Sequence, residues 1–176
     1  YVRLFVGKLF MEFSGAYGFH LSPDLMWQKL NDPEFLRAVI PNCKKFQPRE
    51  ENVYDVASAL GVGPLSLTLR GTVRLKPLQT PTVYRMSAMA NSWLGTTKGS
   101  ALVNLLPHEN GVIFRYRAGL VFSSGVAKIG ASALSGSVDS VVDRFFHRLA
   151  IQLQTTLFDV DELTLGAFIG EMSDEG

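Results

Sequence analysis

The residues that could support metal binding or hydrolysis are few and widely separated. The three histidines, His20, His108 and His147, fall on different predicted elements, and none has the His-Glu-x-x-His spacing of a zinc site. Cys43 is the only cysteine, which excludes an intrachain disulfide and suits a small buried residue in a reducing compartment. No serine lies in a Gly-x-Ser-x-Gly motif. We therefore expect neither a catalytic residue nor a metal ligand.

Two glycine-bounded segments are candidates for anion-binding loops. Residues 61–64, Gly-Val-Gly-Pro, lack the lysine and the serine or threonine of a P-loop, so we interpret them as a turn. Residues 95–99 carry Lys98 between two glycines. A tight connection is the simpler interpretation of this second segment, and an anion site is the alternative.

Arginines recur at alternating positions in two predicted strands: Arg70 and Arg74 in the first, Arg115 and Arg117 in the second. A solvated sheet surface is the simplest interpretation, and a basic patch for acidic lipid or a protein partner is the alternative. Over the whole chain, 17 basic residues nearly balance 16 acidic ones, for a net charge of +1. No general electric field therefore attracts nucleic acid, and we expect no nucleic-acid partner.

An antiparallel meander is predicted to position these residues. Apolar and polar residues alternate over 12–20, 64–76 and 111–122, which is typical of strands with one buried and one wet face. Clusters of turn-forming residues divide the chain between Pro41 and Phe122 into strand-length runs.

Helices are predicted before and after this meander. Ser22-Pro23 and Asp32-Pro33 each combine an N-cap with a first-turn proline, so two short helices should follow one another and end before Pro41. From about Val126 the periodicity predicts an amphipathic helix of about 30 residues, with small residues in its first half and large ones in its second. The predicted fold class is α+β: a curved antiparallel sheet of about seven strands around a long C-terminal helix, enclosing a mostly apolar cavity.

An ordered set of short motifs runs from about residue 11 to residue 154: Met11–Gly15, Tyr17, Trp27, Leu30–Glu34, Leu36, Ile40–Cys43, Val62–Pro64, Gly71, Val73, Leu75, Gly95–Gly99, Phe145–Phe146 and Leu149. This set resembles the CoxG family of carbon monoxide dehydrogenase components, within the START and Bet v 1-like (SRPBCC) superfamily of helix-grip folds. Asn42 stands where the family commonly has glycine, and Thr96-Thr97 where it has an aromatic and a small residue.

The resemblance implies a non-catalytic accessory protein of a molybdenum hydroxylase of the carbon monoxide dehydrogenase type. It also implies a hydrophobic-ligand carrier, for which a lipid or quinone would be a natural cargo, with no covalent cofactor. The implied location is cytoplasmic, peripheral at the inner face of the membrane to which the enzyme is recruited.

We expect the ligand-binding domain to cover residues 11–157, with an N-terminal extension at 1–10 and a C-terminal tail at 158–176. The extension mixes apolar residues with Arg3 and Lys8, and no apolar run reaches the roughly 20 residues of a membrane-spanning helix. Glycines in the first half of the long helix, Gly130 and Gly136, suggest an open volume beneath it. The predicted pocket residues share an apolar phase on facing elements: Leu36, Ile40, Leu67, Leu69, Met86, Ala88, Leu102, Phe114, Ile129 and Ala133.

Two alternatives stay open at this point. In the first, the cavity is incidental and the surface alone docks the hydroxylase onto the membrane. In the second, the chain is an enzyme similar to the polyketide cyclases of the superfamily, which place polar side chains in the cavity. Tyr84, Asn104 and Tyr116 are the candidate residues for that chemistry, although the predicted inner faces carry few ionisable groups.

Overall fold

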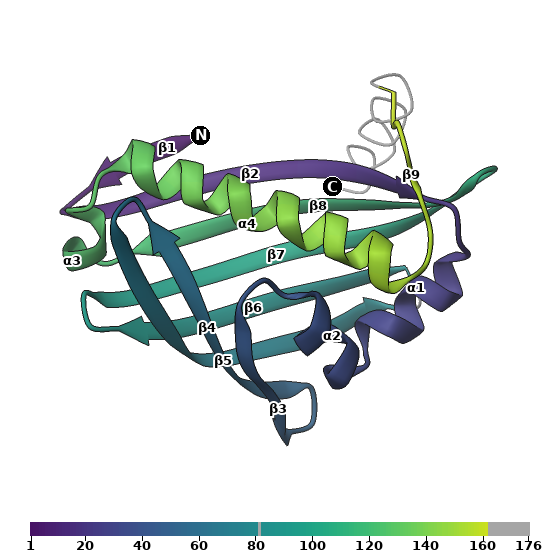
Figure 1. Cartoon of the computed structure of the whole chain (residues 1–176), viewed down its shortest axis with the longest axis horizontal. Helices are drawn as coiled ribbons and strands as arrows, with labels where there is room; N and C mark the ends of the chain where they lie inside the picture. Colours follow the sequence, from purple (N-terminus) through teal and green to yellow (C-terminus); the bar gives the residue numbers. More distant parts are fainter. Residues whose placement is uncertain (81, 162–176) are drawn as a thin grey trace.

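Within the described residues, an antiparallel sheet of nine strands forms the body of the protein (Figure 1). The computed structural model describes residues 1–80 and 82–161. Strands follow the order β1-β2-β8-β7-β6-β5-β4-β3, and β9 pairs with the far end of β2. The strand bounds are β1 Val2–Phe5, β2 Lys8–Phe19, β3 Cys43–Glu50, β4 Val53–Val62, β5 Leu65–Gln79, β6 Val83–Ser92, β7 Gly95–His108, β8 Gly111–Phe122 and β9 Leu157–Phe158.

The alternation in the sequence gives the sheet two distinct faces. In β5, Leu67 and Leu75 are buried, whereas Arg70 and Arg74 are exposed. In β8, Phe114 is buried while Arg117 is exposed. The face that carries the buried side chains is called the inner face below, and the opposite one the outer face. The predicted α+β class and meander are confirmed, with β1 and β9 extending the sheet beyond about seven strands.

Two short helices, α1 Pro23–Leu30 and α2 Pro33–Val39, begin at the predicted caps. The Ser22 hydroxyl accepts a hydrogen bond from the Leu25 N–H at 3.3 Å. The Asp32 carboxylate accepts one from the Glu34 N–H at 3.0 Å and one from the Phe35 N–H at 3.4 Å. These bonds satisfy donors that the first helical turn leaves free, so both helices start where the sequence predicts.

The predicted continuous helix of about 30 residues is wrong at its start. The chain forms a short helix α3 (Ser124–Ala127) and a separate helix α4 of 22 residues (Ala131–Gln152). Gly130 lies between them with φ +106°, a conformation that residues with a side chain rarely adopt. Gly125 holds α3 against the Leu94 carbonyl oxygen, where a Cβ atom would overlap. The amphipathic period continues across the break, which hides it in the sequence.

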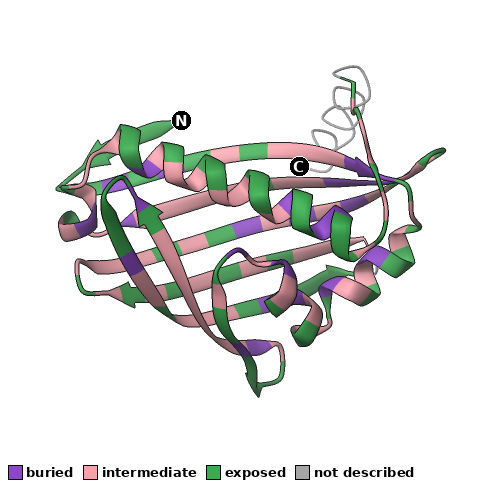
Figure 2. Ribbon diagram, viewed as in Figure 1, coloured by how far each residue is buried: buried purple, intermediate pink, exposed green. Residues whose placement is uncertain are grey.

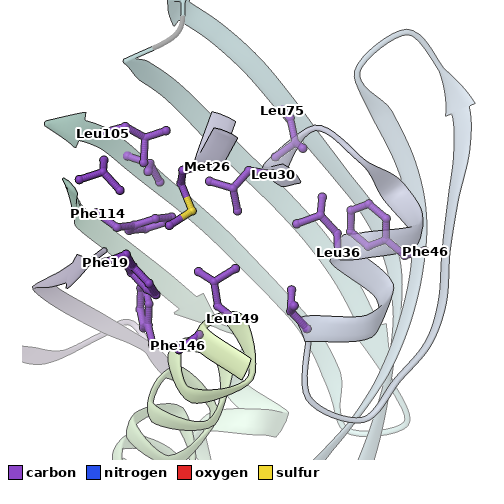
Figure 3. Close-up of a cluster of buried hydrophobic side chains, with 14 residues drawn as sticks. Phe19, Met26, Leu30, Leu36, Phe46, Leu75, Leu105, Phe114, Phe146 and Leu149 are labelled. Atoms are coloured by element: carbon purple, nitrogen blue, oxygen red, sulfur yellow. The ribbon is translucent and has the colours of Figure 1, made fainter. Parts of the chain in front are cut away.

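Helix α4 crosses the inner face of the sheet, and α1 and α2 close one end of it (Figure 1). Two clusters of buried side chains result. The first core cluster lies where α1, α2 and the second half of α4 meet the sheet and includes Phe19, Met26, Leu30, Leu36, Val39, Phe46, Leu75, Leu105, Phe114, Phe146 and Leu149 (Figure 3). The second core cluster lies under α3 and the start of α4: Leu9, Met11, Val62, Leu67, Phe122, Val126 and Leu134.

Two short strands, β1 and β9, pair with the same side of β2, opposite β8. β1 pairs with residues 8–11 of β2, and β9 pairs with Gly18 and Phe19 at its other end. Figure 2 shows β1 as exposed along its length. The predicted C-terminal tail falls mostly on 162–176, outside the described residues. Within the described ranges, no helix has both the length and the apolar character that crossing a membrane requires.

Candidate functional site

The middle of the inner face, between the two core clusters, is lined by small residues. Strand register places them in neighbouring rows across β5 to β8, with Val73, Ala88 and Gly99 in one row and Met86, Ala101 and Ala118 in the next. We call this region the inner hollow and define it by Gly71, Ala88, Ala90, Gly99, Ala101 and Ala118.

Partial exposure of the inner face supports an open space there. Leu69, Gly71, Val73, Ala88 and Ala90 share the inner phase of β5 and β6, yet all five are only half-buried. Helix α4 approaches the sheet along β2 and β4, which flank the strands of the hollow. The helix therefore spans these strands, and the half-buried small side chains between its two lines of contact mark the part of the inner face that is least covered.

Aromatic side chains close the hollow at one end. Phe146 of α4 stacks on Tyr17, with ring centroids 3.8 Å apart and planes 13° apart. It also stacks on Tyr116 at 5.5 Å and meets Phe114 edge-on at 5.1 Å. The second half of α4 is thus packed tightly onto β2 and β8, and the half-buried residues of β5 and β6 lie beyond this aromatic group.

Eight of the ten predicted pocket residues divide among three places. Leu69 and Ala88 face the inner hollow directly. Others belong to, or pack against, the first core cluster: Leu36, Ile40, Met86 and Phe114. Two belong to, or pack against, the second core cluster: Leu67 and Ile129.

Leu102 and Ala133 lie away from the hollow, which corrects the facing predicted for them. Leu102 is paired with Arg85 and Arg117 on the outer face, because its neighbours Ala101 and Val103 take the inner positions of β7. Ala133 is exposed, while Leu134 turns toward the sheet. The buried residues of α4 are Leu134, Phe146, Leu149 and Ala150, and Ala133 falls outside the stripe that they form.

The origin of the open space also differs from the prediction. Gly136 is exposed, and a Cβ atom added to it would meet nothing within 4 Å, so it borders solvent instead of the hollow. Small residues of the sheet that the sequence reasoning did not select also define this region: Gly71, Ala90, Gly99, Ala101 and Ala118. Small residues at alternate positions of adjacent predicted strands were the signal for them. A Cβ atom on Gly71 would overlap the Met89 carbonyl oxygen, and one on Gly99 would crowd Leu120, so these two glycines permit close packing within the sheet.

Tyr17, Tyr84 and Tyr116 bring hydroxyl groups to the inner face. Burial raises the pKa of Tyr84, and burial with Asp143 nearby raises the pKa of Tyr17. Burial, together with Tyr17 and Asp139, raises the pKa of Tyr116 to about 12. These hydroxyls therefore remain protonated at neutral pH and serve as hydrogen-bond donors.

The candidate residues of the cyclase alternative do not converge. Asn104 pairs with Val83 and Arg115 on the outer face, away from Tyr84 and Tyr116. Among the described residues, no charged or polar side chain is fully buried. The inner face can thus hold an apolar molecule and donate hydrogen bonds to it, but the described part of the hollow offers no buried acid or base.

A groove of about 810 Å³ lies on the outer face, near the N-terminus. Its floor comes from β2, β7 and β8, and β1 supplies one wall. Aromatic and basic side chains line it together: Tyr1, Arg3, Phe5, Phe10 and Lys98. Sequence reasoning did not predict this groove, because it depends on how β1 folds back along β2.

Comparison with known families gives one match, to the CoxG family of carbon monoxide dehydrogenase, over residues 16–154. The matched segment contains α1, α2, β3 to β8, α3 and α4. No curated protein sequence matches the chain.

Solved structures share the fold at low identity. A conserved protein from Geobacillus kaustophilus is similar over 85% of this chain and 100% of its own, with 19% identity and a TM-score of 0.73. Ara h 8.0201 is similar over 82% and 99%, with 14% identity and a TM-score of 0.57. The Zhui aromatase/cyclase from Streptomyces sp. R1128 is similar over 80% and 90%, with 12% identity and a TM-score of 0.56. These likenesses show a Bet v 1-like helix-grip fold and leave function to the site.

Proposed function

This chain belongs to the CoxG family of carbon monoxide dehydrogenase components, and from that premise we propose that it is a non-catalytic accessory protein that holds a hydrophobic ligand for a molybdenum hydroxylase. The observation that supports the proposal is the inner hollow, an apolar and partly accessible space lined by Gly71, Ala88, Ala90 and their neighbours. A ligand enclosed there would exchange water for apolar contacts, which is worth about 25 cal/mol per Å² of apolar surface.

The chemistry of the lining favours a lipid or quinone. Apolar side chains predominate around the hollow, with Thr97 beside Ala90, and the protonated hydroxyls of Tyr84 and Tyr116 lie on the same face of the sheet. A carbonyl or carboxyl group of an otherwise apolar molecule can accept a hydrogen bond from such a hydroxyl. We place the ligand-binding domain at residues 11–157. The proposed contacts are Leu36, Ile40, Leu67, Leu69, Met86, Ala88, Phe114 and Ile129, supplemented by Ala90, Gly99, Ala101 and Ala118.

Extraction of the purified protein tests the proposal. Organic extraction followed by mass spectrometry should recover an isoprenoid or fatty compound in stoichiometric amount. Delipidated protein should bind oleate or a short-chain ubiquinone analogue, with quenching of Trp27 fluorescence at the closed end of the fold. If the extracts contain no such compound and neither probe binds, the proposed carrier function is refuted.

Docking of the hydroxylase onto the membrane, with an incidental cavity, is the second candidate. The outer-face groove, with exposed aromatic and basic side chains, is the observation that favours a surface role. Size-exclusion chromatography with the purified hydroxylase separates the two functions. Co-elution and full activity with a variant whose hollow is plugged would leave docking as the sufficient role.

A further inference from the structure

The outer face of the sheet is strongly and one-sidedly basic. Strand register places a set of lysine and arginine side chains there, opposite in phase to the buried positions: Arg3, Lys8, Arg70, Arg74, Lys76, Arg85, Lys98, Arg115 and Arg117. The acidic side chains that register places on the same face are Glu12, Glu50 and Asp55. Since the whole chain has a net charge of only +1, the excess of positive charge on this face is offset by acidic residues elsewhere in the chain.

The nine basic side chains of this set form no ion pair within the described ranges. Asp55 forms ion pairs with Lys45 at 3.7 Å and Arg49 at 3.8 Å, both on β3, and the remaining ion pair joins His147 to Asp143. Lys76 and Arg85 stand directly opposite each other across β5 and β6. Like charges in that position destabilise a sheet, so the arrangement points to an anionic partner outside the chain.

Exposed apolar side chains accompany the basic ones. Tyr1 is 74% exposed, Phe5 66% and Phe10 37%. Register puts Arg3, Phe10, Val121 and Lys98 in one row across β1, β2, β8 and β7, and all four line the 810 Å³ groove. Aromatic groups flanked by cations are typical of surfaces that enter the headgroup region of a membrane.

We propose that the outer face docks onto an anionic lipid bilayer, with β1 and Phe10 inserting apolar side chains while the arginines and lysines face the headgroups. The proposal rests on the proposed function in one respect: a carrier of lipid or quinone must meet the membrane that holds its cargo. A bilayer is favoured over an acidic protein because the apolar side chains, including Met89 at 47% exposure, are spread along the face instead of forming one closed patch. In this orientation α4 and the inner hollow face away from the lipid, toward a partner enzyme.

Co-sedimentation with vesicles tests the docking. The full chain is mixed at low salt with vesicles of phosphatidylcholine containing 30% phosphatidylglycerol, and with pure phosphatidylcholine vesicles. Binding should require the anionic lipid and weaken as salt is added. Each basic side chain near an anionic surface contributes roughly fivefold, so replacing Arg74, Arg85 and Arg117 by serine should lower the partition coefficient on the order of 100-fold.

A matched variant controls for net charge. Replacing Lys29, Lys128 and Arg144 by serine removes the same charge from the helix side of the molecule, and this variant should bind vesicles nearly as well as the wild type. F5S/F10S should lose roughly tenfold, and that loss should persist at high salt. Thermal denaturation verifies that each variant is folded.

Several results would overturn the docking proposal. They are equal losses in the two charge variants, equal binding to pure phosphatidylcholine, or no binding to anionic vesicles at low salt. Loss of hydroxylase co-elution in the outer-face variant, with vesicle binding unchanged, would assign the face to a protein instead. Vesicle binding by a protein that takes up neither oleate nor the quinone analogue would retain the docking and reject the carrier function, so the two failures are distinguishable.

Discussion

Filling the inner hollow with one large side chain tests whether this region is open or already packed. Ala88 is the position for this change, because it faces the hollow between Val73 and Gly99 and contributes only a methyl group. Met86 is less suitable, since it packs against the first core cluster. Ala88→Phe therefore adds a ring where the structure leaves room.

A rise in the free energy of unfolding indicates an open region, and a fall indicates a packed one. If the hollow is open, the new ring is buried against apolar neighbours, which is worth about 1.5–3 kcal/mol before the loss of side-chain entropy. We expect the free energy of unfolding to rise by about 1 kcal/mol and the melting temperature by about 2–4 °C. If side chains already filled the space, overpacking would lower stability by about 1–3 kcal/mol.

Thermal denaturation and ligand titration are measured on the same protein. Ala88→Phe should weaken binding of oleate or the quinone analogue at least tenfold while the fold is kept. Ser87→Phe is the matched control, because Ser87 is the adjacent residue and points to the outer face. A lower melting temperature for Ala88→Phe with ligand binding intact would refute the placement of the hollow.

Three further changes probe the packing around the site. Phe146→Ala removes a buried ring that stacks on Tyr17 and Tyr116; chemical denaturation should show a loss of about 3–5 kcal/mol, and a loss below 1 kcal/mol would contradict this packing. Because the pKa of Tyr116 is raised to about 12, the unfolded chain releases its proton first, so stability should fall between pH 10 and about 12; Tyr116→Phe should flatten that decline, and an unchanged alkaline profile would count against the assignment. Asp32→Ala removes both cap bonds of α2 and should cost about 1 kcal/mol, with Asp32→Asn retaining most of the stability.

The features that could be predicted from the sequence are those set by local chemistry. Ser22 and Asp32 cap their helices because the residue type itself supplies the acceptor. The strands around Arg70 and Arg117 were predictable because charge and apolar side chains alternate strictly there. In both cases a few neighbouring residues determine the local structure.

The errors lie where several answers satisfy the local pattern. Around Leu102, Ala101 to Leu106 is mostly apolar on both phases, so the local pattern does not determine the face, and only pairing with Arg85 and Arg117 does. Around Gly130, the helical period continues through a break that depends on how α3 packs against Leu94. The hollow is a tertiary feature for the same reason, because it needs Ala88, Gly99 and Ala118 to meet from different strands.

The break before α4 has a mechanical consequence. The N–H groups of Ile129 and Gly130 donate back to the carbonyls of Val126 and Ala127, whereas the Gly130 carbonyl accepts the first α4 bond, from the Leu134 N–H. Gly130 thus ends one hydrogen-bond ladder and begins the next, so rotation about its own φ and ψ can tilt the start of α4 without breaking the bonds of α3, which stays against the β6–β7 turn. Ligands of different width could then be accommodated by a tilt of α4 as a rigid body, with the sheet unchanged.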